Sequence, residues 1–333
     1  MNLLSPATRR SAGMTLVELM VAMVVGLILI GGVLQLFVAN KATYNLQEEL
    51  ARLQENARFA TEMISRDLRQ AGYWGCANTF APANMVNGGG GSFSVGINGT
   101  NGTGLNGSDS VGMSGAYGSG IVVSTPYMNT NASSLHVSVG NKLNPADIVL
   151  VSDCSAGDVF QISNNNPDTS GTLDHATGSS VSPGNGNSGN LSKTYAGNAQ
   201  IYKVQYVAYS IANDATTGTP NLYRQDGLNT VTGVLNGAVP LIDGVEMMQV
   251  QYGIETDTNP DKTPNMYVNA GSVTNWTKVV TMRIALLMRT INPIANSATA
   301  QSYTLLDAAA YTPTDRYLRR VFTTTITLRN RAQ

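Results

Sequence analysis

The chain has 333 residues, 42% of them hydrophobic, two cysteines and a formal net charge of −1. A chain this close to neutral has no overall basic field, which excludes nucleic-acid binding by bulk charge alone. Only 12% of the residues are charged, about half the usual share of a soluble domain. Glycine, asparagine, serine and threonine take their place, so the composition favours β-structure with long polar loops and argues against a helical bundle.

The first predicted element is an apolar helix near the N-terminus. Residues 16–38 are enough to cross a hydrocarbon core of roughly 30 Å, and Arg9 and Arg10 before them predict a cytoplasmic N-terminus. Glu18 lies inside the apolar run. An isolated carboxylate in lipid costs on the order of 3 kcal/mol or more, so Glu18 is the first candidate functional residue. The alternative is a plain signal anchor in which Glu18 lies near the interface by chance.

The residues around the start of this run resemble the type IV prepilin signature: Gly, a hydrophobic residue, Thr, two apolar residues and Glu. Here they are Gly13, Met14, Thr15, Leu16, Val17 and Glu18. The resemblance implies that a prepilin peptidase cuts after Gly13 and that the new first residue, Met14, is N-methylated. It also implies that Thr15 and Glu18 serve processing and assembly, with the Glu18 carboxylate pairing with the α-ammonium of a neighbouring subunit and fixing axial register. Met14 stands where many members have Phe; because Met is apolar and unbranched, we expect processing to survive.

An amphipathic helix is predicted to continue the apolar run. Residues 44–72 contain no proline and no interior glycine, and most of them favour helices. Gly72 is the expected stop. The stripe is only about four heptads long, so packing on a sheet is favoured over a two-stranded coiled coil. Its apolar residues recur at spacings of three and four: Leu46, Leu50, Leu53, Ala57, Ala60, Ile64, Leu68 and Ala71.

The end of this helix resembles a narrower family. The block 50–76, LARLQENARFATEMISRDLRQAGYWGC, is similar to the PilW type of minor pilin, in which such a helix runs into a Gly-Tyr-x-Gly-Cys turn. Heads of this family often carry a disulfide, and Cys76 with Cys154 is the one pairing available. Closing a loop of roughly 78 residues would stabilise the fold by about 4–5 kcal/mol in the chain-entropy model. Two free thiols are the alternative.

The remaining chain predicts short strands separated by two stretches rich in Gly, Asn and Ser. Residues 87–120 are expected to form a long surface loop or a loose pair of hairpins, because they can bury little apolar area; residues 164–198 are the second stretch. Segments 242–253, 280–289 and 319–330 also resemble the C-terminal part of PilW-type minor pilins. The expected strands are 121–124, 135–139, 148–152, 159–162, 201–211, 222–224, 245–252, 279–290 and a last one within 316–331.

A search of the sequence for catalytic or binding chemistry finds little. His136 and His175 are interpreted as surface residues, and no H-E-x-x-H, C-x-x-C or G-x-S-x-G motif occurs. The sequence therefore predicts no enzyme, no cofactor and no metal site. A basic patch for DNA is weighed against arginines that pair with acidic residues of a neighbouring subunit; the pairing is favoured, because no aromatic interleaving accompanies them. These arginines are Arg283, Arg289, Arg316, Arg319, Arg320, Arg329 and Arg331.

The residues and the resemblance together predict an α+β, type IV pilin-like fold. A long N-terminal helix, membrane-spanning in its first half and amphipathic in its second, packs on a mainly antiparallel β-sheet head with long Gly/Asn-rich loops. The expected organisation is a leader at 1–13, a transmembrane and assembly helix at 14–38, the amphipathic half of the same helix at 39–72 and a periplasmic head at 73–333.

The function that the resemblance implies is structural. A minor pilin of this type helps to prime type IV pilus assembly, lies at or near the fibre tip, and serves twitching motility and cell adhesion. Implied partners are other minor pilins, the major pilin, the prepilin peptidase and methylase, the inner-membrane assembly platform and a tip adhesin; nucleic acid is not expected. The expected location is the bacterial inner membrane, with the head in the periplasm, before assembly and the pilus on the cell surface afterwards. A minor pseudopilin of type II secretion and a DNA-binding competence pilin are the alternatives.

Overall fold

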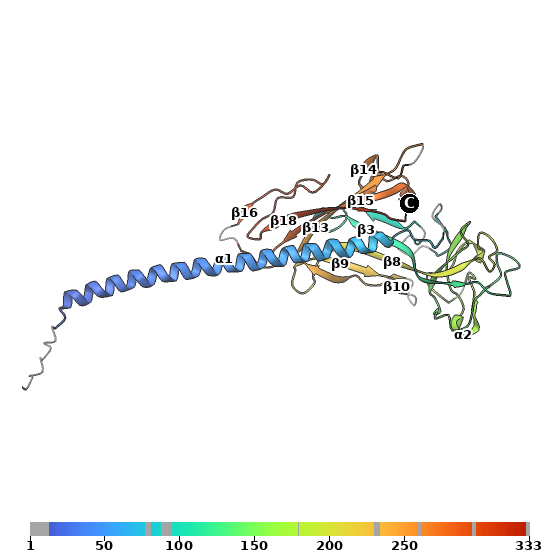
Figure 1. Ribbon diagram of the computed structural model, residues 1–333, viewed down its shortest axis with the longest axis horizontal. Coiled ribbons are helices and arrows are strands. Elements are labelled where there is room, and N and C mark those ends of the chain that lie inside the picture. Colours follow the sequence, from blue (N-terminus) through green and yellow to red (C-terminus); the bar gives the residue numbers. More distant parts are fainter. Residues whose placement is uncertain are drawn as a thin grey trace, which may run out of the picture. The chain divides into compact units, whose positions relative to one another are not determined.

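The computed structural model describes residues 13–76, 81–87, 93, 95–178, 180–229, 234–258, 261–294 and 298–330. Their contacts group the chain into two units, Met1–Ala51 and Arg52–Gln333. One helix, α1 (Leu16–Gln70), runs through both units and has 55 residues (Figure 1). The helix is continuous because no proline occurs between Met14 and Phe80.

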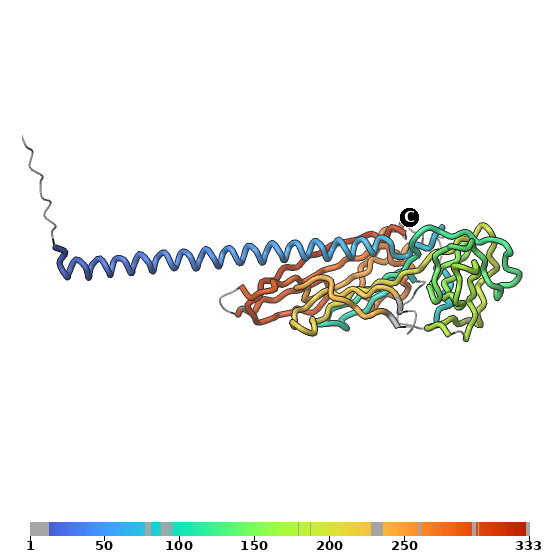
Figure 2. The backbone as a smooth tube through the Cα atoms, turned by 90° about the horizontal axis from the view of Figure 1, so that it is seen from below, coloured from blue at the N-terminus to red at the C-terminus, as the bar shows by residue number. Residues whose placement is uncertain are grey.

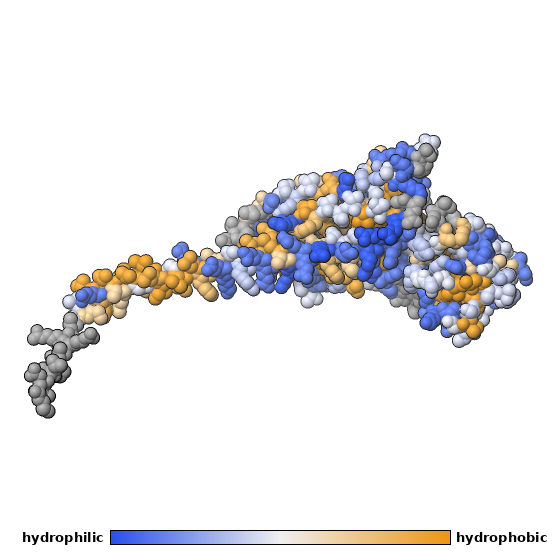
Figure 3. Space-filling model, in the orientation of Figure 1, coloured by the Kyte–Doolittle hydropathy of each residue, from blue (hydrophilic) through white to orange (hydrophobic). Residues whose placement is uncertain are grey.

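Up to residue 45, α1 presents its side chains outward. Every residue from 13 to 45 is exposed except the half-buried Gly26, and the apolar ones colour this part of the helix orange in Figure 3. It is the one helix among the described residues that is long and apolar enough to cross a membrane. Gly31 and Gly32 continue the helix, and no atom of the chain lies within 4 Å of where their Cβ atoms would be.

The second unit contains two main β-sheets. The larger one, called the eight-stranded sheet below, contains six strands in the order β1-β6-β5-β8-β3-β2. The other two strands branch from β8: β9 pairs with β8, and β12 pairs with β9. β8 is its centre, because β3 pairs along one edge while β5 and β9 share the other. Only β1 and β6 pair in parallel among the described strands of this sheet. The strands are β1 (Ala83–Asn84), β2 (Ile97–Thr100), β3 (Ser110–Val122), β5 (Ile148–Ser152), β6 (Gly157–Gln161), β8 (Gln200–Asn213), β9 (Pro220–Asp226) and β12 (Val239–Asp243).

The other main sheet has four antiparallel strands in the order β14-β13-β15-β18. Its alternation is the one expected for 279–290: Met282, Ile284 and Leu286 are buried on one face, and Ala285 and Leu287 are buried on the other. The strands are β13 (Val245–Ile254), β14 (Met266–Val268), β15 (Val279–Arg289) and β18 (Arg319–Thr327).

The main core lies between these two sheets and the second half of α1. Leu53, Ala57, Ala60, Ile64 and Leu68 of the predicted stripe are each at most 2% exposed and pack with residues of both sheets. Burying a Leu or Ile side chain contributes about 1.5–3 kcal/mol, so this stripe holds the helix on the head. Figure 1 shows this half of α1 running along the strands. The fold class is therefore the predicted one.

A separate lobe with its own core occupies one end of the second unit, coloured green in Figure 2. It contains the pair β4 (Leu135–His136) and β7 (Thr172–Leu173) and the short helix α2 (Pro167–Ser170). Two further pairs join β10 (Leu228–Asn229) with β11 (Val234–Leu235) and β16 (Thr299–Ala300) with β17 (Thr314–Asp315). Single turns of 3-10 helix lie at Leu105–Gly107, Asn187–Gly189, Ala270–Ser272 and Trp276–Lys278.

The sequence predicts a long surface loop or a loose pair of hairpins at residues 87–120. β2 and β3 pair as an antiparallel hairpin, and the surface-loop alternative is wrong for residues 110–120, which belong to β3. Two glycines of β3 are sites of close approach: a Cβ at Gly112 would lie 2.3 Å from the Tyr206 hydroxyl, and one at Gly115 would lie 2.9 Å from the Gln70 carbonyl oxygen. Glycine there lets another part of the chain come near the strand. The glycine content that suggested a loop therefore reflects packing.

The interpretation of His175 as a surface residue is also wrong. Its side chain is 2% exposed and packs edge-on against Phe160. Nδ1 lies 2.7 Å from the Gly189 carbonyl oxygen and Nε2 lies 3.0 Å from that of Ser133. These two hydrogen bonds satisfy the buried ring, as a buried polar group requires. Because His175 is buried, residues 164–198 contribute to the core of the lobe.

Candidate functional site

Thr15 and Glu18 form a reciprocal cap at the start of α1. Glu18 Oε2 accepts hydrogen bonds from the Thr15 amide at 2.9 Å and from the Thr15 hydroxyl at 3.1 Å. The Glu18 amide donates to Thr15 Oγ1 at 3.2 Å. This is a capping box, which satisfies amides that a helix start leaves unpaired. The Thr-x-x-Glu spacing is its sequence signal, and reasoning from an assembly role alone misses it.

The cap fixes the Glu18 carboxylate at the first turn and leaves part of it available. Both bonds from Thr15 fall on Oε2, so Oε1 takes no part in the cap. Glu18 is also the one charged side chain between residues 13 and 40. Gly13 and Met14 precede the helix and are exposed, whereas Arg9 and Arg10 lie outside the described residues. The arrangement leaves one oxygen of the Glu18 carboxylate outside the cap.

A polar cluster attaches the second half of α1 to the eight-stranded sheet. Asp67 Oδ2 accepts from the Tyr209 hydroxyl at 2.7 Å and from Arg224 Nε at 3.1 Å. Arg224 also pairs with Asp226 at 2.5 Å. Burial raises the pKa of the Tyr209 hydroxyl, and its bond to Asp67 raises it further, so the phenol stays a proton donor. The helix is thus held by directional bonds in addition to its apolar stripe.

Cys76 and Cys154 form a disulfide, with their Cα atoms 4.9 Å apart. The bridge ties the turn after α1 to the turn between β5 and β6. Cys154 has a left-handed backbone, with φ at 69°, and Asp153 holds this turn by accepting from the amides of Ser155 and Ala156 at 3.1 and 3.0 Å. The disulfide therefore joins α1 to a strand end that is shaped by local hydrogen bonds.

The Asp153 carboxylate also pairs with a lysine. Lys193 Nζ lies 2.6 Å from Asp153 Oδ2. Burial by itself would raise the pKa of Asp153, but the hydrogen bonds from Lys193, Ser155 and Ala156 outweigh burial and lower the pKa to about 2. Asp153 therefore remains ionised at neutral pH beside the disulfide.

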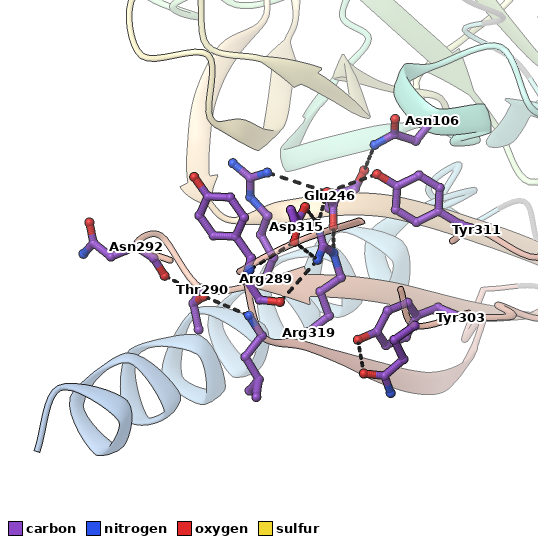
Figure 4. A network of polar contacts seen from close by, with 12 residues as sticks. Asn106, Glu246, Arg289, Thr290, Asn292, Tyr303, Tyr311, Asp315 and Arg319 are labelled. Atoms are coloured by element: carbon purple, nitrogen blue, oxygen red, sulfur yellow. Dashed lines mark hydrogen bonds and ion pairs between the residues drawn. The ribbon is translucent and has the colours of Figure 1, made fainter. Parts of the chain in front are cut away.

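Two of the seven arginines, Arg289 and Arg319, belong to a buried network within the chain (Figure 4). Arg319, with a side chain 3% exposed, donates to both carboxylate oxygens of Glu246 and, at 2.7 and 2.6 Å, to both of Asp315. Arg289 lies 3.7 Å from Glu246 and stacks on Tyr317. The expectation that these arginines pair with a neighbouring subunit is wrong for Arg319 and Arg289, because their acidic partners lie on the same chain.

The remaining arginines of that set lie elsewhere. Arg283 stacks on Tyr267, with the guanidinium carbon 4.0 Å from the ring centroid, and Arg320 is exposed on β18. Arg331 lies outside the described residues. A DNA-binding surface would need these cations free on one face, and two of them, Arg289 and Arg319, pair with Glu246 inside the head.

Comparison with known families matches both ends of the chain. Residues 8–34 match the model of the prokaryotic N-terminal methylation motif, and residues 208–330 match the model of the Type IV Pilus-assembly protein W. No curated protein matches significantly. Among solved structures, the type IV-like pilin TTHA1219 from Thermus thermophilus is 13% identical over 85% of this chain and 98% of that one, with a TM-score of 0.34. A likeness at that level decides nothing about the fold, which the helix and the two sheets define themselves.

The methylation motif at the start of an exposed apolar helix places the chain among the type IV pilins. The C-terminal match then decides between the kinds of pilin, since it covers β13, β15 and β18. The two matches together support a type IV pilin of the PilW type.

Proposed function

We propose that this pilin is a minor pilin that helps to prime type IV pilus assembly and lies at or near the fibre tip with other minor pilins. The observation that carries the proposal is the exposed apolar half of α1. Residues 13–45 bury no side chain within the chain, and so large an apolar surface requires another apolar environment. Lipid supplies it before assembly, and the helices of other pilin subunits supply it in the fibre.

The proposed route begins with removal of residues 1–13 by the prepilin peptidase, which then methylates Met14. Residues 14–38 anchor the subunit in the inner membrane, and residues 39–72 connect them to a periplasmic head at 73–333. The disulfide supports an oxidising compartment for the head, because such bonds persist in the periplasm and are rare in the cytoplasm. The assembly platform then moves the subunit into a complex with other minor pilins, the major pilin and a tip adhesin.

Glu18 has the central role in this route. Cleavage after Gly13 creates an α-ammonium at Met14, and the carboxylate oxygen that the Thr15 cap leaves unused is placed to accept this group from a neighbouring subunit. Pairing relieves two desolvated charges at once and sets the axial register between helices. Gly26, Gly31 and Gly32, which nothing in the chain approaches within 4 Å at the Cβ position, would let neighbouring helices come close.

Two substitutions separate the assembly role of Glu18 from its cap. Glu18→Gln keeps a capping-box acceptor but removes the charge, whereas Glu18→Ala removes both. We expect both variants to be processed and both to reach pili at no more than a tenth of the parent level, measured by immunoblot of sheared pili against membranes. Mass spectrometry should find methylated Met14 at the N-terminus in each. Parent levels of the Gln variant in pili would refute pairing through charge.

Deletion of the gene tests the priming role and the secretion alternative together. We expect surface pili to disappear while the major pilin accumulates in the inner membrane. Normal piliation combined with a defect in protein secretion would instead identify a pseudopilin of a type II system.

A further inference from the structure

The loop that follows β13 gathers three carboxylates. Glu255, Asp257 and Asp261 each offer an oxygen, and these three oxygens lie within 4.8 Å of one another. Two ligands of one Ca²⁺ ion lie at most about 4.8 Å apart, because each Ca²⁺–oxygen distance is roughly 2.4 Å, and the three oxygens meet this requirement. Of the loop residues 255–265, the structure describes all but 259 and 260.

An independent observation concerns Glu255. This residue is only 6% exposed, and its Oε2 is buried with no hydrogen-bond partner. Its side chain contacts that of Asp261, and two ionised carboxylates in contact repel each other unless a cation or a proton lies between them. A buried carboxylate oxygen without a partner is costly, so this position calls for a ligand.

One oxygen of each of the three carboxylates accepts hydrogen bonds, which restrains the side chains. Glu255 Oε1 accepts from the Asp257 amide at 2.8 Å, and Asp257 Oδ2 accepts from the Asn265 side chain at 3.0 Å. Asp261 Oδ1 accepts from the amide and the hydroxyl of Thr263 at 2.9 and 2.5 Å. Among the described residues, no lysine or arginine forms an ion pair with any of the three.

The geometry points to a Ca²⁺ site formed by Glu255, Asp257 and Asp261, which ties the loop between β13 and β14 to the end of β13. The ligands are hard carboxylate oxygens on a loop, which suit Ca²⁺ better than the strict octahedron of Mg²⁺. Three acidic residues within the seven positions 255–261 are the sequence signal for it, and the prediction of no metal site overlooked that signal. Three exposed or loop-borne ligands correspond to the weaker affinity class, with a dissociation constant of about 0.1–1 mM.

The test is calorimetric titration of CaCl₂ into the full-length protein in detergent micelles, after removal of metal with EGTA. We expect one ion per chain with a dissociation constant of about 0.1–1 mM, and at least tenfold weaker binding to Glu255→Gln and Asp257→Asn. Asp243→Asn is the matched control, because Asp243 is exposed on β12 and makes the same charge change away from the site. Failure of the parent to bind, or equal binding by the Glu255→Gln variant, would overturn the assignment.

Thermal unfolding gives a second readout that does not depend on the variant being fully stable. In EGTA, Glu255→Gln should unfold at the same or a higher temperature than the parent, because it removes one of three repelling charges. Added Ca²⁺ at 10 times the dissociation constant should raise the midpoint of the parent and not that of the variant. An equal rise with Mg²⁺ would overturn the choice of Ca²⁺, and a parent insensitive to both ions would mean that a shared proton holds the carboxylates together.

Discussion

Replacing Arg319 with methionine should destabilise the head strongly, because it leaves Glu246 as a buried carboxylate. The side chains of Arg319 and Glu246 are 3% and 4% exposed. The network with Asp315 and Arg289 contains two acids and two arginines, so it is neutral as a whole and carries one uncompensated negative charge after the change. Breaking a buried pair costs about 3–5 kcal/mol. We expect about 3 kcal/mol, since Arg289 at 3.7 Å still faces Glu246.

A double-mutant cycle tests the reason for this loss. Glu246→Gln alone should cost about 1–2 kcal/mol, because Arg319 keeps its two bonds to Asp315. The double variant restores neutrality and should lose less than Arg319→Met alone, about 2 kcal/mol, so that the two changes are coupled by at least about 2 kcal/mol. Free energies of unfolding come from urea titration of the full-length protein in micelles, followed by tryptophan fluorescence.

Arg320→Met is the matched control, since Arg320 is the next residue of β18 and is exposed; it should change the stability by less than about 0.5 kcal/mol. A loss below about 1 kcal/mol for Arg319→Met, or strict additivity in the double variant, would refute the view that the network is a buried charge pair.

The same network predicts a pH dependence. The hydrogen bond from Arg319 lowers the pKa of Asp315. A carboxyl with a lowered folded-state pKa contributes stability above its ordinary pKa of about 4, and that stability is lost as the pH falls through the folded value. Arg319→Met should therefore flatten the acid limb of the stability curve below about pH 4. An unchanged acid limb would show that Asp315 does not depend on Arg319.

Two further predictions concern the disulfide and its surroundings. Replacing Cys76 and Cys154 together with serine should lower the free energy of unfolding by about 4–5 kcal/mol, because the open chain gains the entropy of a loop that spans 78 residues; a loss below about 1 kcal/mol would contradict the entropic account. Lys193→Met should raise the pKa of Asp153 from about 2, observed by NMR titration of the Asp153 carboxyl. Asp153 stabilises the folded protein above its ordinary pKa of about 4, and this contribution is lost as the pH falls through the pKa of the folded state. In the variant, whose folded-state pKa is higher, the contribution of Asp153 to stability should be lost at a higher pH. An unshifted titration would mean that the turn bonds alone hold the carboxylate.

Local patterns predicted the elements whose burial is periodic. The stripe from Leu53 to Leu68 is buried at the predicted spacing, and Ile148–Ser152 is a strand with the predicted bounds. β3 was missed because its glycines look like a loop when read locally. Glycine is required there by tertiary contacts, because a side chain at Gly112 or Gly115 would meet Tyr206 or the end of α1. These contacts are made by residues far away in the sequence, so the local sequence does not reveal them.

The charged residues show the same division. Glu18 was found because a carboxylate in an apolar run is anomalous by itself, and its cap partner Thr15 lies within the same turn. Arg319 and Glu246 are 73 residues apart, so the sequence suggested partners on a neighbouring subunit where the fold pairs the two residues within one chain. The net charge of a chain predicts its overall electrostatic field, but it does not predict which arginines form ion pairs within the folded chain.

The end of α1 shows why these attachments matter to a pilin. A helix end leaves carbonyl groups unpaired, and here the Asn330 side chain lies 3.3, 3.4 and 3.2 Å from those of Arg69, Gln70 and Ala71. Gly72 follows with φ at 70° and donates to the Ser114 carbonyl oxygen at 2.8 Å. The helix end is thus held from the C-terminal segment, from β3 and, through the disulfide, from the turn after β5. A pull along α1 must break several of these hydrogen bonds at once and also meets the covalent disulfide, so the head resists the pull as a whole.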